Sequence, residues 1–199
     1  DRAVKNIFPG NTYFLIQFTH CMPTLHHPLT WMPLSPYQQL KELDADPLLV
    51  NREGLYIWGF VNDDHHFHPY YVGKHRNVIF RLCEHLSNLK GGNYKIYTQE
   101  HLFRGDGEFF YDPVNLAHKV QFVAGEFSPD QAKHVNNMIS RFHFTYCLLP
   151  DFRGVGVKAE ATILHCFSRQ LLINRRFGSR CDDIDIGNLF DIIDVSWDN

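Results

Sequence analysis

The chain has 199 residues, of which 44% are hydrophobic and 21% are charged, and this composition predicts one globular domain with a full core. A net charge of −3 argues against a general nucleic-acid binder, because such proteins are usually basic. No apolar stretch approaches the length of a membrane helix and no secretory signal is visible, so we expect an intracellular, cytoplasmic protein with no membrane partner. The five cysteines lack C-x-x-C spacing, which favours reduced thiols over disulfides.

Strands and helices are expected to alternate along the chain. In chain order, we expect a strand at 12–18, a short helix from 36 to about 43, strands at 54–61 and 69–74, a helix at 78–90, a short helix at 93–102, a strand at 114–124, a helix from 129 to about 142, a strand at 142–149 and a helix at 157–173. The fold class is therefore mixed α/β, of the α+β kind. It consists of a small central β-sheet with an N-terminal β-hairpin, flanked by helices.

Residue types that cap helices set several of these boundaries. Ser35 and Ser128 each precede a proline and stand three residues before a glutamine, a pattern typical of a capping box. Asn77 is the expected N-cap of the helix at 78–90, and the two glycines after this helix end it. The expected buried stripes are Val78, Leu82, Leu86 and Leu89 in this helix, and Val157, Ala161, Leu164, Phe167 and Leu171 in the last helix.

The sequence shows no repeats and no low-complexity linker, so we expect residues 1–199 to form a single domain. Its expected parts are an N-terminal extension at 1–50, a core at 54–174 and a tail at 175–199. Four arginines lie between Arg169 and Arg180, and six aspartates lie between Asp182 and Asp198. Both a basic patch that faces phosphate and a solvated surface with a solubilising tail fit this pattern.

Two short motifs in the hairpin give the clearest chemical signal. They are Gly54-Leu55-Tyr56 and Tyr71-Val72-Gly73, and their tyrosines are fifteen residues apart. If the hairpin closes near residues 63–64, Tyr56 lies opposite Tyr71 and both phenols project from one face of the sheet. Two strand tyrosines that only pack in a core would give the same pattern.

Three further side chains extend this signal. Arg81 and His85 are four residues apart, so they share one face of the helix that follows the hairpin. Glu160 is expected in the first turn of the last helix, where the helix dipole favours an acid. Taken singly, each of the three is typical of an ordinary helix surface.

The joint pattern resembles that of the GIY-YIG endonuclease family. The two tripeptides match the family's two motifs, with conservative apolar changes at Leu55 and Val72. The family's arginine follows the glycine of the second motif by eight residues, as Arg81 follows Gly73, and a histidine one helical turn later matches His85.

The resemblance extends to the C-terminal half of the core and covers residues 54–174 in all. The family's metal-binding glutamate, early in a later helix, matches Glu160, and its asparagine matches Asn174. The segment between the two blocks is long for this family.

This resemblance implies metal-assisted hydrolysis of a nucleic-acid phosphodiester. Such a site must deprotonate water, neutralise the phosphate and stabilise the leaving group. Glu160 is implied as the anchor of one Mg²⁺, for which Mn²⁺ is a substitute. Arg81 is implied as the phosphate clamp, His85 as a phosphate ligand or proton-transfer group, and Asn174 as an orienting residue.

The two tyrosines are implied to act on the nucleophilic water. Tyr56 is the candidate general base or water-orienting group, and Tyr71 positions the water or the phosphate. A phenol has a pKa near 10, so a basic Tyr56 would need its pKa lowered by neighbouring cations. Lys74, Arg81 and the metal are the cations expected to do so.

The function that we expect is a Mg²⁺-dependent DNA endonuclease, specifically a site-specific type II restriction enzyme. The chain has no room for a separate DNA-binding module, so loops on the nuclease core would read the bases. Its partner would be double-stranded DNA, cut either by a homodimer whose symmetry mirrors that of a palindromic target or by a monomer that nicks or cuts twice in sequence. A phage or defence nuclease of low sequence specificity and a catalytically silent nucleic-acid-binding module are the alternatives.

Overall fold

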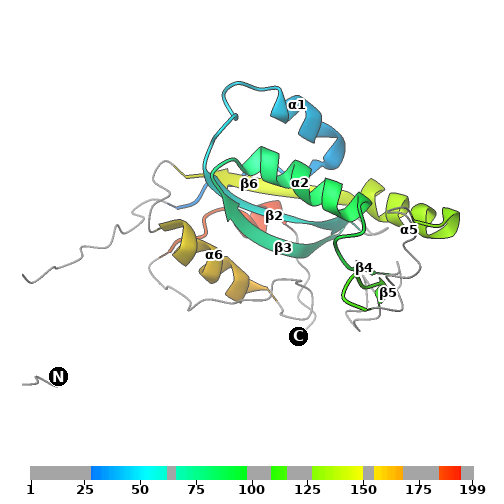
Figure 1. Ribbon diagram of the computed structural model, residues 1–199. Helices are drawn as coiled ribbons and strands as arrows, with labels where there is room; N and C mark the ends of the chain where they lie inside the picture. The colour runs from blue at the N-terminus through cyan, green and yellow to red at the C-terminus, as the bar shows by residue number, and fades with distance from the viewer. Residues whose placement is uncertain are drawn as a thin grey trace, which may run out of the picture.

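A four-stranded antiparallel sheet lies at the centre of the computed structural model (Figure 1). The structure describes residues 28–61, 66–97, 109–115, 127–149, 155–167 and 184–193. Within them the strand order is β1 (Ser35–Pro36), β6 (Phe142–Leu148), β2 (Gly54–Val61) and β3 (Phe67–His75). The strand β3 therefore forms one edge of this sheet, and a separate small sheet pairs β4 (Ile96–Tyr97) with β5 (Phe109–Tyr111).

Helices cover both faces of the central sheet, which confirms the expected α+β class. They are the 3₁₀ helix η1 (Tyr37–Gln39) and the α-helices α1 (Leu40–Asp44), α2 (Val78–Lys90), α5 (Pro129–Ser140), α6 (Val155–Cys166) and α7 (Leu189–Ile192). Figure 1 shows α2 and α6 on opposite faces of the β2–β3 hairpin. None of the helices in the described part of the chain is long and apolar enough to cross a membrane.

The strand β2 divides the core into two apolar layers, because its side chains alternate between the two faces. Leu55 and Ile57 pack in the layer under α6, whereas Tyr56 and Trp58 pack in the layer under α2, α5 and α1. Residues 54–60 are all buried. A strand covered on both faces has no solvent side, which explains why β2 reads as a continuous apolar run.

The helix α2 has the boundaries that its sequence predicts. It begins at Val78, and the side chain of Asn77 accepts a hydrogen bond from the backbone N–H of Phe80. The expected stripe is buried, except that Leu86 is only partly buried. The helix ends at Lys90, directly before the two glycines.

The helix α5 also begins as predicted. The Ser128 hydroxyl accepts a hydrogen bond from the backbone N–H of Gln131, and the Gln131 side chain accepts one from the backbone N–H of Ser128. Both halves of the capping box are therefore present. The strand predicted at 142–149 follows as β6.

The same capping prediction is wrong at Ser35. This residue pairs with Phe144 of β6, and its hydroxyl donates to the carbonyl of Pro33. The residues at the N-caps of η1 and α1 are Pro36 and Gln39, not Ser35, and both helices lack a side-chain cap. Strand pairing has overridden the local signal here.

Three further predictions need correction. Ile96 and Tyr97 form a strand with β5, not part of a helix. Val157 is 60% exposed, because the buried positions of α6 include Val155, Ala159 and Ile163. The expected burial is confirmed at Ala161, Leu164 and Phe167. The strand predicted at 114–124 does not include Val114 and Asn115, which follow β5 in a turn. The predictions at 12–18, 98–102, 116–124 and 168–173, with Leu171, lie outside the described residues.

Segments from both ends of the chain close the layer under α6. The Trp31 indole donates to the carbonyl of Ile186 at 3.0 Å, and its backbone N–H donates to the Asn188 side chain at 2.8 Å. Gly187 has a positive φ of 63°, and the carbonyl of Leu29 fills the place of its missing Cβ. Ile184, Leu189 and Ile193 of the expected acidic tail thus belong to the core, whereas the basic stretch from Arg169 to Arg180 lies outside the described residues.

We predict that Ser128→Ala lowers the free energy of unfolding by about 1 kcal/mol, because it leaves the first turn of α5 uncapped. Ser35→Ala is the matched control, since it removes the same hydroxyl from a sequence signal that caps no helix. Urea denaturation of both variants checks this. An equal loss in the two variants would contradict the assigned role of the capping box.

Candidate functional site

The candidate side chains gather around the edge strand β3. Tyr71 and Gly73 lie on the face covered by α2, and Val72 packs on the face covered by α6. The Lys74 side chain reaches Glu160 of α6. The expected residues of β3 therefore point alternately to its two faces, Tyr71 and Gly73 toward α2 and Val72 and Lys74 toward α6.

Tyr56 lies inside the aromatic layer under α2. Its side chain is 1% exposed, and its hydroxyl lies 2.8 Å from Nε2 of His85. Its ring stacks on that of Tyr71, with centroids 6.1 Å apart. Both phenols share one face, as predicted, but the predicted register is wrong: Tyr56 pairs with Gly73, and Tyr71 pairs with Trp58.

A bulge explains the arrangement of the β3 aromatics. Trp58 pairs with Tyr71 but the next residue, Gly59, pairs with Pro69, so Tyr70 is the extra residue in β3. The pairing of the tyrosines differs from the prediction by two positions, which leaves Tyr56 and Tyr71 on the same face.

Gly73 makes room for the Tyr56 phenol. A Cβ at this position would lie 2.5 Å from Cζ of Tyr56 and 2.7 Å from Cε1 of Tyr71, closer than side-chain atoms can approach. The glycine of the second motif therefore has a steric role, because any larger residue would displace the Tyr56 hydroxyl from His85.

His85 is fully buried, at 1% exposure, and both of its ring nitrogens have partners. While Nε2 faces Tyr56, Nδ1 lies 2.7 Å from the hydroxyl of Tyr94. Asn88 donates to the same Tyr94 hydroxyl at 3.5 Å. Tyr94 was not among the expected residues, because it follows the end of α2 in a segment without periodicity or motif.

Arg81 lies between an acid and the buried phenol. Its Nη1 donates to Glu84 at 2.9 Å, and it also lies near enough to the Tyr56 hydroxyl to interact with it electrostatically. Burial alone would lower the pKa of Arg81, but these two partners outweigh burial and raise it above its ordinary value. Arg81 therefore brings a permanent positive charge to the edge of the aromatic layer.

Lys74 and Glu160 form an ion pair across the α6 side, with 3.2 Å between Nζ and the carboxylate. The Glu160 side chain is 21% exposed, so solvent reaches it. Glu160 lies in the second turn of α6 and not in the first, since α6 already includes Val155. Lys74 is consequently directed at an acid, not at Tyr56.

The charge of Glu160 also acts on Tyr71. Burial, and then this carboxylate, raise the pKa of Tyr71 above its ordinary value, while Arg81 and a hydrogen bond with Tyr56 act in the opposite direction. Tyr71 is half-buried, and its hydroxyl is influenced electrostatically by both Glu160 and Arg81.

The pKa values of Tyr56 and His85 contradict the expectation that neighbouring cations lower the pKa of Tyr56. Burial, and then Tyr71, raise the pKa of Tyr56 above its ordinary value, although Arg81 opposes the shift. Burial, and then the charges of Arg81 and His75, lower the pKa of His85 to about 3. At neutral pH, Tyr56 is therefore a neutral phenol and His85 an uncharged imidazole. The cations do not make Tyr56 a strong base in this state.

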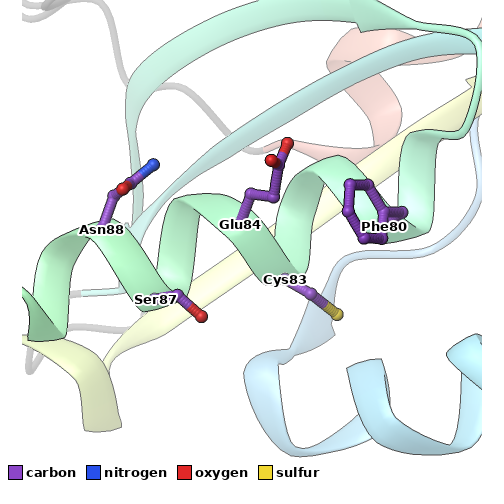
Figure 2. A pocket seen from close by; sticks show the side chains of 5 residues that line it. All are labelled: Phe80, Cys83, Glu84, Ser87 and Asn88. Carbon is purple, nitrogen blue, oxygen red and sulfur yellow. The ribbon is translucent and has the colours of Figure 1, made fainter.

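A pocket of about 310 Å³ runs along the outer side of α2 (Figure 2). Its lining residues all come from this helix and are Phe80, Cys83, Glu84, Ser87 and Asn88. It is open to solvent and includes Asn88, which contacts Tyr94.

Asn174 lies outside the described residues. The expected metal anchor is the single carboxylate of Glu160 and not a cluster of ligands. No group of three or more His, Cys, Asp or Glu side chains able to hold a metal occurs in the described part of the chain. Comparison with family models, with curated proteins and with solved structures finds no match to this chain.

We predict that Gly73→Ala destabilises the fold by about 1–3 kcal/mol, the usual cost of overpacking. The added Cβ would push Tyr56 and Tyr71 out of their places. Gly91→Ala is the matched control, because its Cβ would meet nothing nearer than 3.3 Å. Chemical denaturation compares the two variants. Equal stability of Gly73→Ala and the wild type would show that the tyrosines can move freely.

We also predict that His85 makes the fold sensitive to acid. The unfolded chain protonates His85 near pH 6.5 but the folded protein does so only near pH 3, so the unfolded state binds more protons between these values. The unfolding free energy should therefore fall as the pH drops through this window, by up to about 1.4 kcal/mol per pH unit.

The variant His85→Gln isolates this effect, because it lacks the titrating group. Urea denaturation between about pH 7 and pH 4 should show its stability approaching that of the wild type as the pH falls. A gap between the two proteins that stays constant over this range would contradict the prediction.

Proposed function

We propose that this chain is a metal-dependent DNA endonuclease of the GIY-YIG type. The observation that carries the proposal is the hydrogen bond between the two motif residues Tyr56 and His85, with the charge of Arg81 acting on both side chains. Tyr71 lies next to Tyr56, and the charge of Glu160 acts on Tyr71. Residues that were selected by motif spacing alone thus meet at one strand edge.

The site can bind and polarise a phosphodiester. Arg81 presents a planar fork of donors, of which Glu84 engages one nitrogen, and its fixed charge would offset that of a phosphate oxygen. Lys74 adds a second positive charge on the other side of β3. Both residues oppose the repulsion that a phosphate anion exerts on an incoming water.

The geometry supports a division of labour between the tyrosines. Tyr71 is half-buried and can contact a substrate water, whereas Tyr56 lies behind it with 1% exposure. Since the pKa of Tyr56 is raised, we infer that Tyr56 does not act as an isolated tyrosinate base. It passes a proton from Tyr71 to the uncharged His85, which has an available lone pair at neutral pH.

Glu160 fits the role of metal anchor for Mg²⁺, with Mn²⁺ as substitute. A single, partly exposed carboxylate suits a hard cation that keeps several waters and is completed by substrate phosphate oxygens. The same donor set does not suit zinc, which requires several nitrogen or sulfur ligands. When bound, the metal would supply an acidified water and charge neutralisation. Its binding requires Glu160 to exchange its ion pair with Lys74.

Double-stranded DNA is the proposed partner, and a site-specific type II restriction enzyme is the proposed role. One such site cuts one strand, so a duplex break calls for two copies that face opposite strands. Incubation with several plasmids and Mg²⁺ tests the proposal. Discrete bands indicate site specificity and a smear a nuclease of low specificity, while intact plasmids would contradict the proposed activity and favour a silent binding module.

We predict that Glu160→Gln stops Mg²⁺-dependent cleavage but leaves the fold and DNA binding largely intact, because it removes the metal anchor. Glu42→Gln, which changes an exposed carboxylate of α1, is the matched control. Plasmid cleavage and mobility-shift assays measure both properties. Near-normal cutting by Glu160→Gln would refute the assignment of the metal site.

A further inference from the structure

The buried pair Tyr56–His85 has a continuation that the motif residues do not account for. The Tyr94 hydroxyl lies 2.7 Å from Nδ1 of His85, on the side opposite to the 2.8 Å contact between Nε2 and Tyr56. The three side chains therefore form one hydrogen-bonded row. Because a neutral imidazole carries a single proton, its two partners must play opposite roles: one donates to the ring and the other accepts from it.

Burial distinguishes the two ends of this row. Tyr56 and His85 are each 1% exposed, so neither can exchange a proton with bulk water directly. Tyr94 is only half-buried, and it contacts Asn88, which lines the solvent-filled pocket along α2 (Figure 2). Tyr94 is therefore the most exposed member of the row, and a proton that enters at Tyr56 can leave through it.

Asn88 is held in the orientation that serves this contact. Its carbonyl accepts a hydrogen bond from the Asn93 side chain at 3.1 Å, which directs its amide N–H toward Tyr94. The Tyr94 oxygen thus lies where two donors, Asn88 and His85, can reach it. Its own hydroxyl proton is then directed away from the imidazole.

We propose that Tyr94 is a positioning residue that keeps the proton of His85 on Nδ1, so that Nε2 accepts from Tyr56, and that Tyr94 is the outlet for the proton removed from the nucleophile. This inference rests on the proposed nuclease function. An acidic residue often holds a catalytic histidine in this way, and Tyr94 does so here without adding a charge to the apolar layer.

Each step of the transfer moves one proton. The substrate water loses a proton to the Tyr71 oxygen, Tyr71 gives its own to Tyr56, and Tyr56 gives its own to Nε2 of His85. His85 releases its Nδ1 proton to the Tyr94 oxygen, and the Tyr94 hydroxyl proton passes to solvent. The net result is hydroxide at the phosphate and one proton in solution. The row is restored when Tyr94 takes up a proton from solvent, each transfer runs in reverse, and Tyr71 gives a proton to an oxygen of the product or to water.

The surrounding charges favour passage of the proton over its storage. Arg81 and His75 face His85, Arg81 and Tyr71 face Tyr56, and Arg81 and Glu84 face Tyr94. The positive charge of Arg81 disfavours an imidazolium at His85. Glu84, at the far end, attracts the outgoing proton and lines the same pocket.

The tautomer of His85 can be measured without any activity, from the ¹⁵N chemical shifts of its ring in labelled full-length protein at neutral pH. We expect a protonated Nδ1 and an unprotonated Nε2 in the wild type. In Tyr94→Phe, which keeps the ring but loses the acceptor, the proton should move toward Nε2. A wild-type ring protonated on Nε2, or an unchanged tautomer in Tyr94→Phe, would overturn the proposal.

Kinetics give the second readout. Tyr94→Phe should lower kcat by about tenfold or more with KM unchanged, because Tyr94 acts on proton transfer and does not touch the substrate. Tyr70→Phe is the matched control: it removes a hydroxyl from the same aromatic layer, one that donates to the Lys95 carbonyl and not to a member of the Tyr56–His85–Tyr94 row. An equal loss of kcat in both variants would contradict the proposal that Tyr94 is the outlet for the proton. If the wild type cuts no DNA, the nuclease function fails, while the ring spectrum still decides the tautomer.

Discussion

The hydrogen bond between Tyr56 and His85 inside an aromatic layer constrains much of the surrounding structure. A buried polar group without a partner costs about 1–3 kcal/mol, so the pairing of the Tyr56 hydroxyl and of both His85 ring nitrogens stabilises this layer. The buried indole nitrogen of Trp58 in the same layer has no hydrogen-bond partner among the described residues. The contact between Tyr56 and His85 depends on the glycine at position 73, which leaves room for the phenol, and on the packing of α2 over β2. The contact with Tyr94 depends on the return of the chain toward His85 after α2 ends. His85 of α2 thereby connects β2, through Tyr56 at 2.8 Å, with the segment after α2, through Tyr94 at 2.7 Å.

Local signals account for the parts of the fold that the sequence predicts well. The cap at Asn77 and the apolar stripe of α2 are both encoded within thirteen residues, and the structure keeps them. Ser35 carries the same kind of signal as Ser128 but lies beside the edge of β6, where strand pairing takes precedence. A capping box predicts a helix only where no neighbouring strand competes for its backbone, and the sequence does not reveal that neighbour.

The candidate site shows the same limit at longer range. Motif spacing selects Tyr56, Tyr71 and His85, and period-two alternation is enough to place both phenols on one face. The bulge in β3 changes their pairing but not that face. Burial, which controls the pKa of Tyr56 and of His85, depends on α5 and on distant aromatic residues, so its direction could not be derived from the motif. Tyr94 could not be selected either, because no local pattern marks its return to α2.

The edge strand separates two electrostatic environments, and this separation bears on the proposed chemistry. On the face under α2, Tyr56 and His85 are uncharged and shielded from water, so a proton can pass between them without a lasting charge in a medium of low dielectric constant. On the other face, Lys74 and Glu160 are charged and partly exposed, so a cation or a phosphate can exchange with either partner at little cost. Tyr71 belongs to both environments. A phosphate bound at this edge would therefore meet fixed charge on one side and a route for protons on the other, which metal-assisted hydrolysis requires together.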